Sequence, residues 1–351
     1  MSKWQFSQIK DRIMSKLPSG GSSIPWLNTA VGGTLVVLMI LLVLLGVFWS
    51  NQPGIFSVVQ KANEHADTQG RNVVVGYTTV ATLHELGETL LQKPGGFITN
   101  DKMPPGIWLD NISNWEMGVL VQIRDLSRAL RKDFARSQSQ STEDNDLAKA
   151  EPKFHFDNNS WILPASESEY REALLFLDKY LARLADPDNP QAQFYARADN
   201  LNSWLADVET RLGSLSQQLS ASVGQVRVNT NLAGDPNAQQ STGQGEQEKI
   251  RTPWLQIDDT FYEARGTAWA LLHLLKAVEV DFNGVLEKKN AIVSLQQIIR
   301  ELEETQASIW SPIILNGSGF GLVANHSLVM ANYISRANAA ISDLRDLLQN
   351  G

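Results

Sequence analysis

The sequence VGGTLVVLMILLVLLGVFW, from Val31 to Trp49, decides the architecture of this chain. No charged residue interrupts these 19 residues. At about 1.5 Å rise per residue, a helix of this length approaches the ~30 Å hydrocarbon core of a bilayer. Trp26 and Trp49 flank the run, as interfacial aromatic residues flank a spanning helix. We therefore expect a transmembrane anchor over residues 26–50.

Two alternatives to an anchor are a cleaved signal peptide and a buried helix of a soluble protein. The apolar run exceeds the usual signal core of about 7–15 residues. No pair of small residues suited to cleavage occurs at its exit, Gly46–Ser50. An uncleaved anchor is the interpretation we favour.

The charges on either side of the apolar run predict its orientation. Four basic residues and one acidic residue lie within residues 1–25, whereas only Lys61 and Arg71 are basic in the stretch after the run. The positive-inside rule therefore predicts a cytoplasmic tail over residues 1–25. The C-terminal body is expected on the other side of the membrane, outside the cytoplasm.

The composition limits the function of this body. The chain has a net charge of −8, so the body without its basic tail carries a charge of −11. Such an acidic body is a poor candidate for binding nucleic acid. The chain contains no cysteine, which excludes disulfides, thiol nucleophiles and iron–sulfur ligation. A domain of this size can be stable on its hydrophobic core alone.

Apolar residues recur at helical spacing through most of the body. We expect a mainly α fold: one N-terminal transmembrane helix followed by an all-α helical bundle with little strand. The expected segments are a connector over 51–70, a first helical part over 71–228, a disordered linker over 229–250, and C-terminal helices over 251–351.

The clearest periodicity runs from Phe194 to Leu219, where apolar residues alternate steps of four and three. This spacing is typical of a heptad seam. It predicts either a seam inside one bundle, which we favour, or a coiled coil that joins two copies of the chain.

Local patterns give further expectations. Residues 137–160 are polar and read as irregular, and Ser166 with Glu169 matches a capping box that opens a helix. One continuous helix is expected from Leu286 to about Trp310. A short strand is expected over Val223–Val228, and Val73–Val75 fits either a strand or the lead into a helix.

Five strings between residues 95 and 141 resemble one family of bacterial membrane proteins. They are GGFITND (95–101), PGIWLDN (105–111), WEMGV (115–119), QIRD (122–125) and RSQSQS (136–141). The family is catalogued as domain of unknown function 2333. The resemblance implies a Gram-negative envelope protein with one N-terminal span. It implies no reaction, so no catalytic residue is carried over.

A cationic strip on the helix expected over 113–137 is the best candidate for a binding surface. Its members recur at helical spacing: Arg124, Arg128, Arg131, Lys132 and Arg136. Such a strip could bind an acidic partner, a lipid headgroup or an anionic polymer. It could also be a solvated face, or one paired with Glu143, Asp144 and Asp146.

The turn-rich segment 95–112 and the residue Trp115 just after it add four residues to the candidate partner site: Trp108, Asp110, Asn111 and Trp115. A loop of this length inside a compact domain is often functional. Exposed tryptophans stack on sugars or proteins, whereas buried ones fix loops to a bundle. The sequence leaves open whether the segment binds a partner or is packed.

Other motifs are incomplete, so we predict no catalytic residue, metal or cofactor. His84-Glu85-Leu86-Gly87-Glu88 lacks the second histidine of a zinc-protease motif. His155 with Asp157 is a weak metal pair, and Asp258 with Asp259 suits the first turn of a helix as well as paired-carboxylate chemistry. Gly317–Gly321 lacks the spacing of a phosphate-binding loop.

Two functions remain in competition. The first is a non-enzymatic envelope protein that binds a partner protein or assists assembly, with self-assembly through Phe194–Leu219 as a variant. The second is a periplasmic enzyme or ligand-binding protein that acts on cell-wall or surface polysaccharide, suggested by Trp108, Trp161 and scattered carboxylates.

Overall fold

The computed structural model describes residues 25–137, 141–188, 192–228, 247–311, 313–318 and 321–350. The chain divides into two units, residues 1–47 and residues 48–351. Apart from Pro25, the predicted cytoplasmic tail lies outside the described residues. Residues 229–246, most of the predicted linker, also lie outside them.

The apolar run forms one uninterrupted helix, α2 (Pro25–Trp49). Within the described ranges, only Val31–Trp49 is long and apolar enough to cross a membrane, with a mean hydropathy of 2.8. Most of the aliphatic side chains along the helix are exposed, and Leu44, for example, is 61% exposed. The helix is consistent with a single-pass anchor or a signal sequence.

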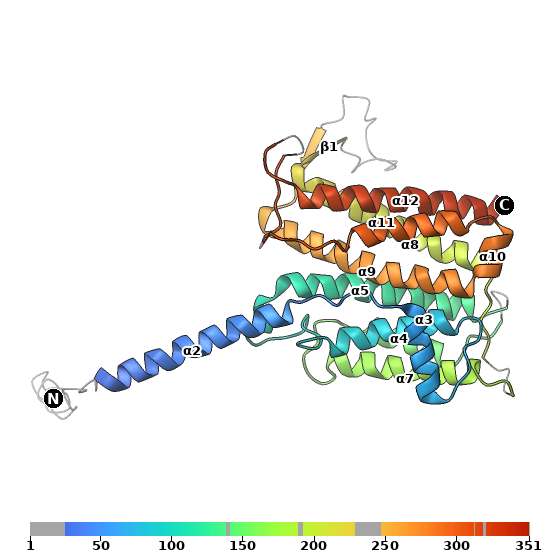
Figure 1. Ribbon diagram of the computed structural model, residues 1–351, viewed down its shortest axis with the longest axis horizontal. Coiled ribbons are helices and arrows are strands. Elements are labelled where there is room, and N and C mark those ends of the chain that lie inside the picture. Colours follow the sequence, from blue (N-terminus) through green and yellow to red (C-terminus); the bar gives the residue numbers. More distant parts are fainter. Residues whose placement is uncertain are drawn as a thin grey trace, which may run out of the picture. The chain divides into compact units, whose positions relative to one another are not determined.

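The second unit is mainly α-helical, which confirms the predicted fold class. Its longer helices are α3 (Val58–Gln69), α4 (Tyr77–Gln92), α5 (Asp110–Ala129), α7 (Ser166–Leu184), α8 (Ala198–Ser220), α9 (Ile257–Asp281), α11 (Ile292–Glu304) and α12 (His326–Asn350). Figure 1 shows α5 and α9 in the middle, with α8, α11 and α12 on one side and α3, α4 and α7 on the other.

Helices α5 and α9 cross in close contact because glycines face backbone at the crossing. A Cβ atom on Gly118 would lie 2.1 Å from the carbonyl oxygen of Glu263, and one on Gly266 would lie 2.0 Å from that of Trp115. No side chain fits at either position. Because the helices belong to 71–228 and 251–351, the crossing joins both parts in one core.

The seam from Phe194 to Leu219 faces the interior of the same chain. Leu201, Leu205 and Leu212 on α8 are fully buried, and α8 packs along α12. The two helices run antiparallel, with Ser216 near Ala331 at one end and Glu209 paired with Arg345 towards the other. The structure therefore supports the bundle interpretation of this seam.

The start of α4 is fixed by the end of α9. Gly76 adopts a left-handed backbone, with φ of 89°, just before α4 begins. Asp281 then accepts hydrogen bonds of 2.6 Å from both the backbone nitrogen and the hydroxyl of Thr79. The carboxylate thus satisfies a donor in the first turn of α4. Val73–Val75 leads into this helix and forms no strand.

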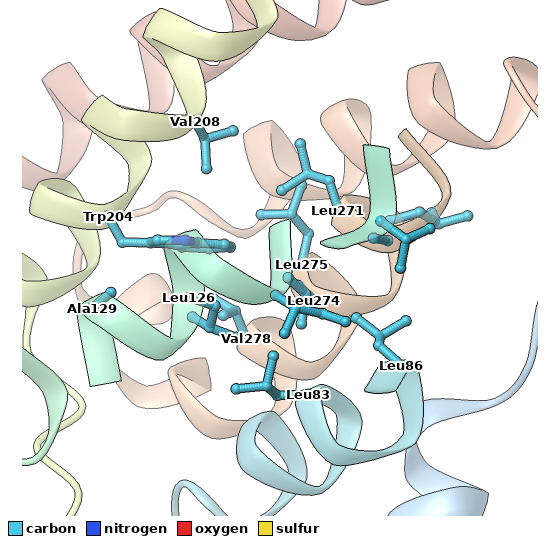
Figure 2. Close-up of a cluster of buried hydrophobic side chains, with 14 of the residues drawn as sticks. Leu83, Leu86, Leu126, Ala129, Trp204, Val208, Leu271, Leu274, Leu275 and Val278 are labelled. Atoms are coloured by element: carbon cyan, nitrogen blue, oxygen red, sulfur yellow. The ribbon is translucent and has the colours of Figure 1, made fainter. Parts of the chain in front are cut away.

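Helices α4, α5 and α9 meet in the hydrophobic core. Figure 2 shows Leu83 and Leu86 of α4 beside Leu274 and Leu275 of α9, and Leu126 of α5 close by. All five side chains are fully buried. The predicted buried helix at Ala268–Val280 is therefore the centre of the unit.

The prediction of an irregular segment over 137–160 is wrong in part. Residues Leu147–Phe154 form α6, and both Leu147 and Phe154 are buried. The helix is short and contains Pro152, so its periodicity is too brief to stand out among polar neighbours.

Helix α7 begins where expected but without the predicted capping box. The hydroxyl of Ser166 donates to the carbonyl oxygens of Asp157 (2.7 Å) and Ser160 (3.0 Å). Glu169 instead binds Lys153, at 2.7 Å. Tertiary partners have replaced the local reciprocal bonds.

The predicted helix from Leu286 to Trp310 is interrupted. Residues Asn283–Lys288 form α10, and α11 begins at Ile292. Asn290 between them has a left-handed backbone with φ of 51°. Asparagine tolerates this conformation better than most residues, and it ends the first helix.

The predicted strand is present as β1 (Gln225–Val228). It pairs antiparallel with β2 (Gln247–Ile250), which begins inside the segment predicted as a disordered linker. That prediction is therefore wrong for the last four residues of the segment.

Candidate functional site

Arg124, the first member of the cationic strip, is used inside the molecule. Its guanidinium donates to the carbonyl oxygens of Phe154 (2.7 Å) and Phe156 (2.8 Å). These carbonyls end α6 and would otherwise lack helical partners. Arg124 therefore fixes α6 to α5 and is a structural residue.

The next arginines of the strip form a network with two acidic residues. Arg131 pairs with Glu151 and lies 3.5 Å from Glu143, and Arg136 lies 3.8 Å from Glu143. Arg128 is 3.8 Å from Glu151. The acidic segment thus folds back on the strip, as one of the sequence alternatives proposed.

Two other acids of that segment bind elsewhere. Arg183 of α7 pairs with Asp144 at 2.8 Å and with Asp146 at 2.6 Å. Lys132 alone of the strip is classed as exposed, and the side chain of Arg128 is 36% exposed. The strip therefore offers little free charge to a partner.

The base of the segment 95–112 is packed around a buried ion pair. Lys93 Nζ lies 2.6 Å from Glu116 Oε1, and their side chains are 1% and 0% exposed. The same carboxylate accepts hydrogen bonds from the backbone nitrogens of Ile98 (2.9 Å) and Thr99 (2.8 Å). Burial raises the pKa of Glu116, while Lys93 and the donors of Thr99 and Ile98 oppose that rise.

The four candidate residues in and just after this segment differ in exposure. Trp108 is 59% exposed, Asp110 is exposed and Asn111 is half-buried. Trp115 is fully buried, with its ring centroid 5.1 Å from that of Trp269. Trp115 lies on the face of α5 that meets α9, inside the core and not at the surface of the unit.

A second exposed apolar segment lies beside this loop. Asn100 Nδ2 donates to the carbonyl oxygen of Ser160 (2.8 Å) and to Glu167 (2.7 Å), which joins the loop to the segment before α7. Six large side chains of these segments are at least 51% exposed. We call them the apolar rim: Met103, Ile107, Trp108, Trp161, Ile162 and Leu163. Sequence analysis found only its two tryptophans.

The histidine motif around His84 shows no metal geometry. His84 lies 5.1 Å from His65 between ring centroids, and Glu85 is paired with Lys61 at 3.0 Å. Burial lowers the pKa of His84 to about 4, so the ring is neutral at pH 7. The described ranges contain no group of three potential metal-ligating side chains. These residues line a polar cavity of about 640 Å³.

The remaining motifs make ordinary structural contacts. His155 Nδ1 lies 2.9 Å from the carbonyl oxygen of Glu151, and its Nε2 lies 3.0 Å from Arg128. Asp259 in the first turn of α9 accepts a 2.7 Å hydrogen bond from Asn114. Burial and the neighbouring Asp258 raise the pKa of Asp259.

The glycine-rich turn uses its amides internally. Gly317 N donates to the carbonyl oxygen of Ala324 (3.0 Å), and Gly321 N donates to that of Ser318 (2.8 Å). Residues 319 and 320 lie outside the described residues. An interhelical turn explains this part of the motif.

A groove beside α12 is the feature that sequence analysis missed. It has a volume of about 450 Å³ and is lined mainly by apolar and aromatic side chains of α9, the segment 304–315 and α12. Phe261 and Met330 are buried in it, whereas Trp310 is 96% exposed. We call it the α12 groove. No signal for it was available in the sequence, because the helix from Leu286 was predicted to continue to about Trp310.

The wall of the α12 groove is held by one arginine. Arg265 of α9 donates to the carbonyl oxygens of Thr305 (3.2 Å), Gln306 (3.0 Å) and Ala307 (2.9 Å). Its Nε also donates to the side chain of Gln52 at 2.7 Å. The groove is therefore preformed and lies close to the segment that follows α2. Neither this groove nor the polar cavity is lined by Trp108 or Trp161.

The fold and the groove define a class: a helical-bundle protein with one N-terminal apolar helix and a preformed apolar groove. The chain belongs to the family described as "Uncharacterized protein conserved in bacteria (DUF2333)", whose model matches residues 22–351. This match confirms the resemblance noted in the sequence. No curated protein and no solved structure matches the chain.

Proposed function

We propose that this chain is a single-pass protein of the bacterial inner membrane that acts as a non-enzymatic binding protein. Its tail would lie in the cytoplasm and its helical unit in the periplasm. The apolar helix Val31–Trp49, the basic residues before it and the bacterial family support this placement.

The single observation that carries the binding function is the α12 groove. Apolar grooves with few polar groups receive hydrophobic side chains of a partner, and tryptophan is enriched among the residues that supply most of the binding energy. Trp310 stands at the edge, Phe261 and Met330 form the floor, and Arg265 prevents the wall from collapsing. We assign the groove to an apolar segment of another envelope protein.

Photo-crosslinking in the native membrane tests this assignment. A photoreactive amino acid replaces Ser308 or Val329 at the α12 groove, and Val293 serves as the control because it is 75% exposed on α11 and lines neither cavity. We expect one discrete adduct from both groove positions and none from Val293.

A charged substitution in the groove tests whether the interaction is hydrophobic. Val329→Asp places a charge in the α12 groove without disturbing the core, because Val329 is 56% exposed. It should remove the adduct formed from Ser308, whereas Val293→Asp should leave it unchanged. The same adducts from Val293 as from Ser308 and Val329 would contradict the proposal. An adduct from Ser308 that still forms in the Val329→Asp variant would also contradict it.

A further inference from the structure

The large apolar side chains of the apolar rim are exposed to solvent, and hydrogen bonds fix the backbone that carries them. Monomeric soluble proteins rarely keep a contiguous apolar patch exposed unless it binds something. Leu163 is 90% exposed and has a positive φ of 56°, a strained conformation for a bulky residue. The backbone is thus constrained to present Trp161, Ile162 and Leu163 outwards.

The base of the rim cannot easily move to cover these side chains. Asn100 is fully buried and bonded to both Ser160 and Glu167. On the other side, Glu116 binds the backbone of Ile98 and Thr99. The apolar rim is therefore fixed in position before any ligand arrives.

The place of the rim within the second unit indicates what covers it. The second unit begins at Phe48, so it includes Phe48 and Trp49, the last two residues of the apolar run. A Cβ on Gly95 would lie 2.8 Å from the ring of Trp49, and Asn51–Pro53 line the same cavity as Lys93 and Pro94. The segment that carries Met103, Ile107 and Trp108 therefore starts beside the segment that leaves the apolar helix.

We infer that the apolar rim inserts into the interfacial layer of the lipid bilayer. Tryptophan is enriched at this depth because its ring is apolar and its N–H is polar. The rim offers two exposed tryptophans and four aliphatic or thioether side chains. The loop with Met103 and Trp108 has one basic residue, Lys102, and two acidic residues, Asp101 and Asp110. The contact with lipid is therefore hydrophobic and does not depend on attraction between basic residues and anionic headgroups.

Site-specific fluorescence in lipid vesicles tests this inference, which rests on the proposed anchoring. The chain contains no cysteine, so single cysteines can be introduced without removing others. Ile107→Cys and Ile162→Cys report on the apolar rim, Leu38→Cys reports on α2, and Val293→Cys is the exposed control. Each full-length variant is labelled with an environment-sensitive dye and placed in vesicles of phosphatidylethanolamine and phosphatidylglycerol.

We expect spin-labelled lipids to quench the dye at residues 38, 107 and 162 but not at residue 293. Quenching at 107 and 162 should persist in 1 M salt, because no charge attraction holds the rim (Debye length ~3 Å at this ionic strength). A dye at residue 38 that lipid does not quench contradicts the anchoring itself. Quenching at 38 alone overturns only the rim insertion.

Two further outcomes would also overturn the rim insertion. A blue shift at 107 and 162 without lipid quenching, dependent on protein concentration, would assign the rim to a second copy of the chain. Loss of quenching in 1 M salt would assign the contact to charge. Circular dichroism of each variant confirms that the helical unit is intact.

Discussion

Removing one partner of the Lys93–Glu116 pair should destabilise the second unit strongly. Both side chains are essentially inaccessible to water, at 1% and 0% exposure, and their charged atoms are 2.6 Å apart. Lys93→Met leaves the Glu116 carboxylate without its counter-ion in the interior. Removal of one partner of a buried ion pair typically lowers the free energy of unfolding by about 3–5 kcal/mol.

A double variant that lacks both charges distinguishes the effect of an uncompensated charge from the effect of changed packing. In Glu116→Gln the amide oxygen can still accept from Ile98 and Thr99, but Lys93 loses its counter-ion and keeps only the carbonyl of Gly96, at 2.7 Å. Combining it with Lys93→Met removes both buried charges. We expect the double variant to be more stable than either single variant, because neither charge is left uncompensated.

Chemical denaturation of the full-length protein in detergent, followed by circular dichroism, measures these free energies of unfolding. Hydrogen exchange at the amides of Ile98 and Thr99 gives a local readout, since both donate to Glu116. Single variants that each cost less than about 1 kcal/mol, or a double variant whose cost is the sum of the two, would refute the role of the pair.

Three other measurements follow from the structure. Gly266→Ala places a methyl group 2.0 Å from a backbone carbonyl oxygen of α5 and should cost about 2–3 kcal/mol by denaturation, whereas Gly213→Ala, with its nearest atom at 3.6 Å, should be neutral or slightly stabilising. Burial on α9 lowers the pKa of His273 from 6.5 to about 4. Since the unfolded chain binds this proton more readily, the stability that the neutral ring contributes is complete above pH 6.5 and is lost as the pH falls towards 4. The stability of the wild type should fall by roughly 3 kcal/mol more than that of His273→Gln over this range, and parallel pH profiles would contradict this account. For the orientation, an impermeant maleimide applied to intact inner membranes should label Ser308→Cys and spare Ser2→Cys; the reverse pattern would place the helical unit in the cytoplasm.

The helices were predictable because their signal is local. The 4-3 spacing in Phe194–Leu219 and the dense apolar run at Ala268–Val280 each specify a buried face without reference to the rest of the chain. The break at Asn290 was missed because a left-handed residue leaves no mark on the apolar period. The same holds for α6, which has too few turns to show one.

The candidate site was less predictable because partners come from distant segments. The spacing of the arginines shows that charge lies on one face of α5 and the helical turn after it, Leu130–Phe134, but not that the carbonyls of α6 and Glu143 will use it. Trp115 lies on the face of α5 that meets α9, whereas Trp108 ends a short 3-10 turn before α5 and is exposed. The α12 groove requires α9 and α12 to meet around Arg265, and no local pattern encodes that meeting.

The carboxylate of Asp281 at the start of α4 has a consequence for the order of synthesis. Thr79 and Asp281 are 202 residues apart, so a ribosome that adds about 5–20 residues per second makes the acceptor roughly 10–40 s after the donor. Over that interval the first turn of α4 lacks its partner, and the face of α4 that α9 will cover is bare. Protection of that face against aggregation is therefore needed until α9 has been made, about four fifths of the way along the chain.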